Sequence, residues 1–334
     1  MSASETAIKA IPTNIITGFL GVGKTSAILN LLESKPTDER WAVLVNEFGE
    51  IGVDGSLFQG RHGEEQQVYI REVPGGCMCC AAGLPMQIAL NQLLTRAKPD
   101  RLLIEPTGLG HPVEVLEVLT ADYYREVLSI QKTLTLVDAR KLEDDRYTGH
   151  DTFNQQIAIA DVVVGNKQDL YSPEHFQLLE NYIADKSALD ATVVFSEQGK
   201  VSLALLDGPS AMTLPGHHHH HHKSESGVGA ADQPLPQQGF LKAVNQGEGF
   251  QSVGWRFDPV KTFDRSRLYA FLSGITAERM KAVFITGEGV FGYNLTSDAL
   301  LEIELDDCLE SRIEIIALEV DPSWEEGLFA CLDD

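Results

Sequence analysis

The stretch that decides the fold is Thr13-Asn-Ile-Ile-Thr-Gly18-Phe-Leu-Gly21-Val22-Gly23-Lys24-Thr25-Ser26. It starts as an apolar strand, continues as a glycine-rich turn and ends as the first turn of a helix. Gly18 and Gly23-Lys24-Thr25 have the P-loop spacing of a glycine, four residues, and then Gly-Lys-Ser/Thr. Backbone N–H groups and the helix N-terminus attract phosphates in such a turn. The stretch therefore predicts a nucleotide-binding protein.

Two side chains of this loop are expected to act on the phosphates. Lys24 can reach the β- and γ-phosphates, so we assign it a catalytic role, and the Thr25 hydroxyl can hold Mg²⁺. The residues expected to contact the nucleotide in this stretch are Gly18, Gly21, Val22, Gly23, Lys24, Thr25 and Ser26.

A second motif predicts which base is bound. Asn166-Lys167-Gln168-Asp169 follows an apolar strand far downstream of the P-loop. This Asn-Lys-x-Asp pattern resembles the guanine-specificity motif of GTPases, in which the aspartate accepts hydrogen bonds from guanine N1 and the 2-amino group. We therefore expect Asn166, Lys167 and Asp169 to bind GTP. The segment 196–198 lies where such proteins have a further base-contacting loop.

A third motif follows the apolar strand Arg101-Leu-Leu-Ile-Glu105. Glu105 stands where a Walker-B acid would stand, and its carboxylate could hold a magnesium-bound water or orient the attacking water, so we assign it a catalytic role. Thr107 and Gly108 are expected to sense the γ-phosphate through a backbone N–H. Because no arginine is placed as a finger, we expect slow hydrolysis of GTP to GDP and phosphate.

Strand and helix signals alternate up to about residue 200, and each motif above follows a strand. This alternation predicts an α/β fold class, a P-loop GTPase domain with a mostly parallel sheet, over residues 1–206. Residues 207–249 are rich in Gly, Pro, Ser and Gln and contain six consecutive histidines, which predicts a flexible His-rich linker. Short alternating strands with two helices predict a small α+β C-terminal domain over residues 250–334.

The net charge of −23 bears on the partners. Phosphates would be repelled by such a chain, so we expect no nucleic acid and no anionic membrane as a partner. No apolar run approaches the ~20 residues that span a bilayer, and the start Met1-Ser-Ala-Ser-Glu5 lacks the pattern of a signal peptide. We therefore expect a cytoplasmic protein, and homo-oligomerisation stays open.

Three of the five cysteines lie within four residues, at Cys77, Cys79 and Cys80. An odd count clustered in this way fits thiolate metal chemistry in a reducing compartment better than disulfides. Three thiolates can bind an ion such as Zn²⁺ and leave a tetrahedral site one ligand short, which suits a transferable ion. Candidates for the fourth position are Glu47, Glu50, water or a partner residue, with the lone His111 less favoured. The remaining cysteines, Cys308 and Cys331, are expected to be packing residues.

Taken together, these motifs resemble the CobW-like metallochaperone GTPases, and within them the YeiR-type bacterial members. The resemblance rests on segments 18–25, 45–50, 76–80, 103–108 and 166–169, and is less specific in the C-terminal part. It implies slow GTP hydrolysis coupled to the binding of a metal, most often zinc, and its delivery to a client metalloprotein. Some relatives carry an acidic residue where this chain has Val45, which puts any additional metal site using that position in doubt.

The six histidines His217 to His222 allow two interpretations, a purification tag or a native tract. Tags usually sit at a terminus, and family members often carry such tracts in this linker, so a native tract that collects Zn²⁺, Ni²⁺ or Co²⁺ is favoured.

Alternative functions stay open. One is a zinc storage or sensing protein regulated by nucleotide, and another is insertion of cobalt into a corrinoid or iron into a nitrile hydratase. A small-molecule kinase is disfavoured, because Asn166 to Asp169 point to guanine and no arginine-rich lid is visible.

Overall fold

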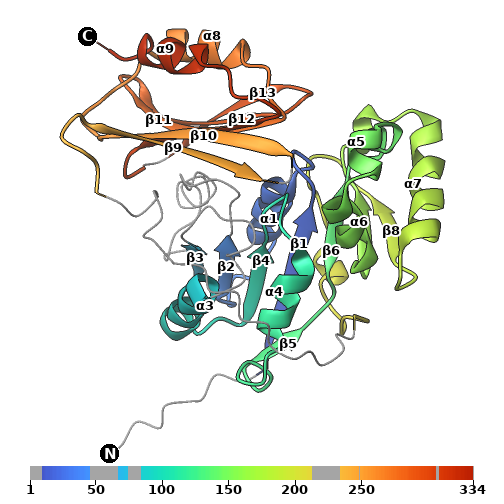
Figure 1. Cartoon of the computed structure of the whole chain (residues 1–334). Coiled ribbons are helices and arrows are strands. Elements are labelled where there is room, and N and C mark those ends of the chain that lie inside the picture. Colours follow the sequence, from blue (N-terminus) through green and yellow to red (C-terminus); the bar gives the residue numbers. More distant parts are fainter. Residues whose placement is uncertain are drawn as a thin grey trace, which may run out of the picture. The chain divides into compact units, whose positions relative to one another are not determined.

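A computed structural model describes residues 10–45, 67–73, 84–212, 234–247, 249–305 and 308–333. The chain divides into two compact units. Within the described residues, the first unit comprises 10–45, 67–71 and 84–212, and the second comprises 72–73 and the residues from 234 onward. Each unit is built around one sheet (Figure 1).

The first sheet has eight strands in the order β3-β2-β4-β1-β6-β7-β8, with β5 also pairing with β1. The pairs β1–β4, β1–β5, β1–β6, β2–β4, β6–β7 and β7–β8 are parallel. The strands are β1 (Ile11–Gly18), β2 (Trp41–Val45), β3 (Val68–Glu72), β4 (Arg101–Glu105), β5 (Leu128–Ile130), β6 (Leu134–Val137), β7 (Val162–Gly165) and β8 (Thr192–Phe195). Several of them are buried along their whole length, as expected for parallel strands covered on both faces.

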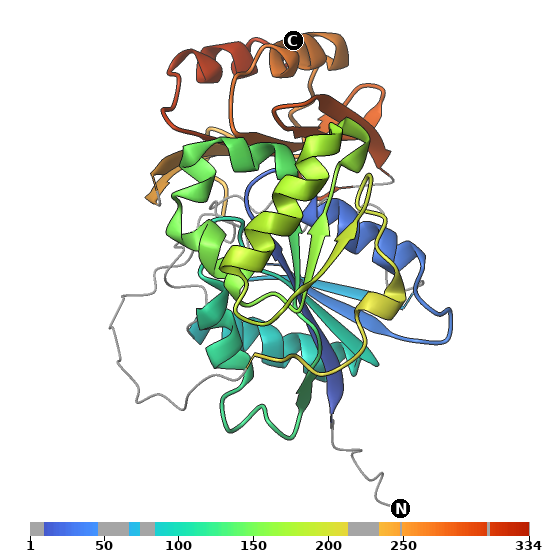
Figure 2. The same cartoon turned by 90° about the vertical axis from the view of Figure 1, so that its right-hand side faces the viewer.

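Helices cover both faces of this sheet, with α1 on the face opposite to α4 (Figures 1 and 2). The α-helices are α1 (Lys24–Glu33), α3 (Leu84–Ala97), α4 (Pro112–Leu119), α5 (Asp145–Thr148), α6 (Asp151–Ala158) and α7 (Pro173–Lys186). Three short 3₁₀ helices lie between them, η2 (Ala139–Glu143), η3 (Gln168–Leu170) and η4 (Leu203–Leu205). This arrangement brings the carboxyl ends of the parallel strands to one edge of the sheet, where ligands bind in such folds.

Asn14, in the middle of β1, ties the end of the first unit to its central strand. Its fully buried side chain donates to the carbonyl oxygens of Lys132 at 2.9 Å and Leu206 at 2.7 Å. Its Oδ1 accepts from Arg101 at 2.7 Å, and Arg101 also forms an ion pair with Asp207 at 2.7 Å. Residues that follow β8 are therefore held by hydrogen bonds to residues near the start of the chain.

The second unit is an antiparallel sheet of six strands in the order β13-β12-β11-β14-β10-β9. Helices α8 and α9 lie on one of its faces (Figure 1), and Leu268 and Leu328 from them join Trp255 and Phe284 in one apolar core. The elements are β9 (Phe240–Gly247), β10 (Phe250–Phe257), α8 (Arg265–Ser273), β11 (Arg279–Thr286), β12 (Gly289–Leu295), β13 (Leu300–Leu305), β14 (Ser311–Ala317) and α9 (Ser323–Phe329).

The predicted fold class is confirmed: a mostly parallel sheet with helices on both faces is joined to a small α+β unit. The linker prediction is wrong at both ends of the range 207–249. Residues 240–247 form strand β9, which pairs with β10 along its whole length, so partner pairing outweighs the weak strand signal of this segment. At the other end, Gly208 and Ala211 donate from their backbone N–H groups to Gln131 and Asp161 of the first unit. The run His217 to His222 lies outside the described residues.

Candidate nucleotide-binding site

The P-loop joins the end of β1 to the start of α1, as predicted from its sequence. Gly18 and Gly23 have φ angles of +141° and +97°, which side chains rarely adopt. A Cβ atom at Gly18 would lie 2.4 Å from the Leu136 carbonyl oxygen, and one at Gly23 would lie 2.6 Å from Asn166 Nδ2. Both positions therefore require glycine, because strand β6 and the Asn166 side chain press directly against the loop.

The Lys24 side chain folds back over this loop. Its Nζ donates to the carbonyl oxygens of Gly18 at 2.9 Å and Phe19 at 3.2 Å, and the residue is 7% exposed. An ammonium group held at the mouth of a glycine-rich turn supplies the positive charge that phosphate binding needs. The position of Lys24 fits the phosphate-binding role expected of it.

Thr25 and Glu105 lie side by side next to the P-loop. The Thr25 hydroxyl donates to Glu105 Oε1 at 3.0 Å, and both residues are at least nine-tenths buried. Glu105 reaches this place because β4, which it ends, pairs with β1. A hydroxyl and a carboxylate oxygen are ligand types that Mg²⁺ prefers, so this pair fits the predicted magnesium site.

Thr107 and Gly108 follow Glu105 and approach the same loop. A Cβ at Gly108 would lie 3.0 Å from both Lys24 Nζ and Leu20 Cδ2. The Thr107 hydroxyl accepts from the Leu109 N–H at 3.1 Å, which orders the turn that leads to α4. The structure thus brings Lys24, Thr25, Glu105 and Gly108 together, although two segments about 80 residues apart supply them.

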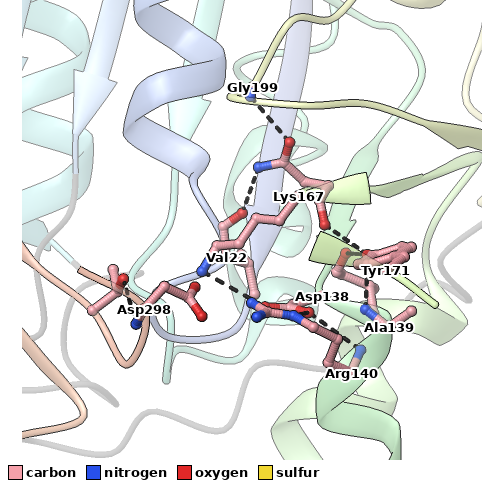
Figure 3. Close-up of polar contacts among 11 residues, drawn as sticks. Val22, Asp138, Ala139, Arg140, Lys167, Tyr171, Gly199 and Asp298 are labelled. Carbon is pink, nitrogen blue, oxygen red and sulfur yellow. Dashed lines mark hydrogen bonds and ion pairs between the residues drawn. The ribbon is translucent and has the colours of Figure 1, made fainter. Parts of the chain in front are cut away.

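On the other side of the P-loop, the Asn166 side chain connects Val22 to Gly199, and both of these partners are labelled in Figure 3. Its Nδ2 donates to the Val22 carbonyl at 2.9 Å, and its Oδ1 accepts from the Gly199 N–H at 3.0 Å. Lys167 adopts a left-handed conformation with a φ of +66°, and the side chain of Asp169 is exposed. The segment Asn166 to Asp169 is therefore anchored to the P-loop by its first residue and presents its last residue to solvent.

The predicted loop 196–198 also belongs to this site. The Gln168 N–H donates to the Ser196 carbonyl at 3.0 Å, and the Asn30 side chain of α1 donates to the Gln198 carbonyl at 2.9 Å. Gly199 packs so closely on α1 that a Cβ there would lie 2.7 Å from the Ala27 nitrogen. The loop is thus fixed against both the Asn166 segment and the first turn of α1.

Two residues that the sequence did not single out support this segment. Asp138, which follows β6 and is 1% exposed, forms ion pairs with Arg140 at 2.6 Å and Lys167 at 3.6 Å (Figure 3). The Tyr171 hydroxyl accepts from the Ala139 N–H at 2.8 Å and donates to the Asn166 carbonyl at 2.6 Å. Burial, above all, raises the pKa of Tyr171 well above its usual range. The only sequence signal for Asp138 was an acid directly after an apolar strand.

The predicted metal ligands Glu47, Glu50, Cys77, Cys79 and Cys80 lie outside the described residues. Within the part of the chain that the structure describes, no group of three or more His, Cys, Asp or Glu residues could hold a metal ion. Cys331 is a packing residue, as predicted: it is buried in the core of the second unit, and burial raises its pKa to about 11. Cys308 packs at the margin of a smaller apolar cluster.

Comparison with known proteins identifies the family. Residues 12–202 match the family model described as "CobW/HypB/UreG, nucleotide-binding domain". The chain belongs to the CobW/HypB/UreG family. This range contains all three segments that form the site above, so the CobW/HypB/UreG match and the geometry of the P-loop both indicate nucleotide binding.

Three known proteins are similar to this chain to different degrees. The zinc chaperone YeiR of Escherichia coli K12 is 42% identical over 310 residues, which covers 91% of this chain and 92% of that protein. The zinc chaperone CobW of Sinorhizobium is 29% identical over 59% of this chain and 62% of that protein. Among solved structures, the Zn(II)-bound YjiA GTPase of E. coli is 18% identical with a TM-score of 0.46, covering 97% of this chain and 99% of that one. The expected likeness to YeiR-type members is confirmed.

None of the helices that the structure describes is long and apolar enough to cross a membrane.

Proposed function

We propose that this chain is a GTP-binding and GTP-hydrolysing metallochaperone that binds zinc and delivers it to a client metalloprotein. The observation that carries the proposal is the similarity to the zinc chaperone YeiR, which extends over 91% of this chain and so well beyond the nucleotide-binding domain. The client is unidentified, and a reducing cytoplasm is the compartment that keeps cysteine thiolates available for metal binding.

The phosphate side of the site supports GTP hydrolysis. Lys24, held over the P-loop, would bind the β- and γ-phosphates, and the Gly108 segment next to it would meet the γ-phosphate. Thr25 and Glu105 would hold Mg²⁺, which supplies positive charge against the charge that develops on the phosphate oxygens. Turnover is expected to be slow, since the sequence places no arginine finger here.

The base side of the site supports a preference for guanine. Asp169 is exposed, so its carboxylate would accept hydrogen bonds from guanine N1 and the 2-amino group. The aliphatic part of Lys167 would lie against the base, while its ammonium group pairs with Asp138. Adenine presents an acceptor at N1 and lacks the 2-amino group, so the same carboxylate would disfavour ATP.

Zinc is the cargo in this proposal. Cys77, Cys79 and Cys80 would hold it as thiolates, with Glu47 or Glu50 as candidates for the remaining position. In sequence these residues lie between the P-loop and the Glu105–Gly108 segment. A γ-phosphate-dependent change in those segments would therefore alter the metal affinity, a known route from hydrolysis to remodelling.

The test is the zinc affinity of the whole chain in each nucleotide state. We would titrate the metal-free protein with Zn²⁺ against a chromogenic chelator, with Mg²⁺ and either a non-hydrolysable GTP analogue or GDP. A variant with Cys77, Cys79 and Cys80 changed to Ser is the control for the metal site. Repeating the titration with residues 217–222 changed to Ser separates the histidine run from the cysteine site.

We expect a nucleotide-dependent zinc affinity that is lost in the cysteine variant. Equal affinities in both states would contradict the coupled cycle and favour zinc storage or sensing. If Co²⁺ or Fe²⁺ binds more tightly than Zn²⁺ and its affinity depends on the nucleotide, the result would favour a chaperone that inserts cobalt or iron.

A further inference from the structure

The side chain of Gln156, on α6, reaches the segment that follows Glu105. Gln156 is fully buried, and its Nε2 donates to the Gly108 carbonyl oxygen at 3.0 Å. We propose that Gln156 is a positioning residue for the γ-phosphate of GTP, because it orients the Gly108 backbone beside Lys24. The inference rests on the proposed GTP-binding function and adds a residue that the sequence motifs do not contain.

The peptide group between Gly108 and Leu109 is held at both of its polar atoms. Gln156 binds its carbonyl oxygen, and the Thr107 hydroxyl accepts from its N–H at 3.1 Å. The preceding peptide is held at the Thr107 carbonyl, which accepts from the Gly110 N–H at 3.1 Å. These bonds fix the orientation of both peptides that flank the Gly108 Cα atom.

With the neighbouring groups occupied, the Gly108 N–H is the donor that remains for a ligand. It donates to no acceptor among the residues that the structure describes. The Gly108 Cα lies close to Lys24, since a Cβ built on it would be 3.0 Å from the ammonium nitrogen. A backbone N–H and an ammonium group close together form a site for a phosphate oxygen.

The other end of the Gln156 amide argues for a role beyond stability. Its Oε1 is buried and has no hydrogen-bond partner within the described residues. A buried polar atom without a partner costs free energy, and an apolar side chain of similar length would avoid that cost. The amide therefore adds little to stability at this place, while its N–H group holds Gly108.

Helix α6 holds Gln156 in a fixed place relative to the P-loop. The Thr135 hydroxyl of β6 donates to the Gln156 backbone carbonyl at 2.7 Å. On the same helix, the Phe153 ring packs edge-on against the P-loop residue Phe19, with centroids 5.9 Å apart. Gln156 therefore holds Gly108 from a helix that is itself fixed to β6 and to the P-loop.

The test compares ligands with and without a γ-phosphate on the whole chain. We would measure the Kd for GDP and for a non-hydrolysable GTP analogue, both with Mg²⁺, in the wild type and in Gln156→Met. Methionine keeps the length and bulk of glutamine and removes only the amide. The matched control is Gln155→Met, a partly exposed neighbour on α6.

We expect Gln156→Met to weaken the binding of the GTP analogue about tenfold, as for the loss of one well-oriented hydrogen bond to a charged group. The affinity for GDP should be unchanged. Gln155→Met should bind both ligands as the wild type does. If Gln156→Met fails to fold, Thr107→Val, which releases the same peptide from its other side, should give the same selective loss.

Equal losses for GDP and the GTP analogue, or wild-type affinities for both, would overturn the role of Gln156 and leave the proposed function standing. A wild-type protein that binds neither guanine nucleotide would instead overturn the proposed function.

Discussion

The two sheets of this protein place their buried charged side chains differently. In the parallel sheet, Glu105 ends a strand and Asp138 directly follows one, both at the carboxyl edge. In the antiparallel sheet, buried charged residues lie within the strands, and Lys281 stands directly opposite Glu314 on the neighbouring strand. A parallel sheet covered on both faces leaves its strand ends for ligand chemistry, whereas an antiparallel sheet can carry polar groups along one face. We therefore assign the nucleotide chemistry to the first sheet.

The largest expected effect tests whether the second sheet is needed for that chemistry. Trp255 is 1% exposed in the core of the second unit, so Trp255→Ala should cost about 3–5 kcal/mol of that unit's stability. Thermal unfolding checks the loss, with Val260→Ala, at an 84% exposed position, as the control. At a temperature where the variant is folded, the GDP affinity should equal that of the wild type. A large drop in GDP affinity would show that the second sheet also contributes to nucleotide binding.

The next effect is expected at the phosphate end of the first sheet. Lys24→Ala removes a buried ammonium group that would bind phosphate oxygens, so GTP affinity should fall about 100-fold, or ~2.7 kcal/mol. Titration with a fluorescent GTP analogue measures this change, and Lys186→Ala at the end of α7 serves as the control. An affinity within about twofold of the wild type would show that the phosphates are bound elsewhere.

A smaller effect is expected at the base end. Tyr171→Phe leaves the Ala139 N–H without its acceptor and frees the Asn166 carbonyl, so GTP and GDP affinities should fall together by about 3- to 10-fold. Tyr182→Phe is the matched control, because its hydroxyl binds Asn154 at 2.7 Å and does not touch the Asn166 segment. The GTP and GDP affinities of both variants are measured in parallel titrations. If Tyr171→Phe and Tyr182→Phe bind the nucleotides equally well, Tyr171 contributes to stability alone.

The smallest effect concerns the pH dependence of the second sheet. Hydrogen bonds from Arg265, above all, lower the pKa of Glu302. The ionised carboxylate therefore contributes stability that is present above its unfolded pKa of about 4.3 and is lost as the pH falls through the folded value. Glu302→Gln should make the unfolding temperature less dependent on pH below this point, with Glu304→Gln on the same strand as the control. An unchanged slope would show that this ion pair contributes nothing measurable.

Motifs made of neighbouring residues were predictable from the sequence. The P-loop needs glycines at positions 18 and 23 because backbone and side chains press on them, and this requirement appears as a fixed spacing. Glu105 and Asn166 were found in the same way, since each stands at a fixed place after an apolar strand. The alternation of strands and helices was sufficient for the fold class.

Residues that act across long sequence separations were not predictable. Tyr171 and Gln156 support the site through single hydrogen bonds to Asn166 and Gly108, and no spacing rule marks such contacts. Strand β9 was missed for a related reason, since its order comes from pairing with β10 rather than from its own composition. The side chains that recognise the nucleotide are thus easier to find than those that hold them in place.

The bond from Asn14 to the Leu206 carbonyl has a consequence for synthesis on the ribosome. The P-loop is translated before the residues that complete its contacts, which are Glu105, Asn166 and Gly199, and the central strand gains its bond to Leu206 later still. At ~5–20 residues per second, the interval between Lys24 and Leu206 is roughly 10–35 s. During this time the nascent chain carries a glycine-rich loop that has no completed pocket. We therefore expect nucleotide binding to begin only after the whole first unit has been translated.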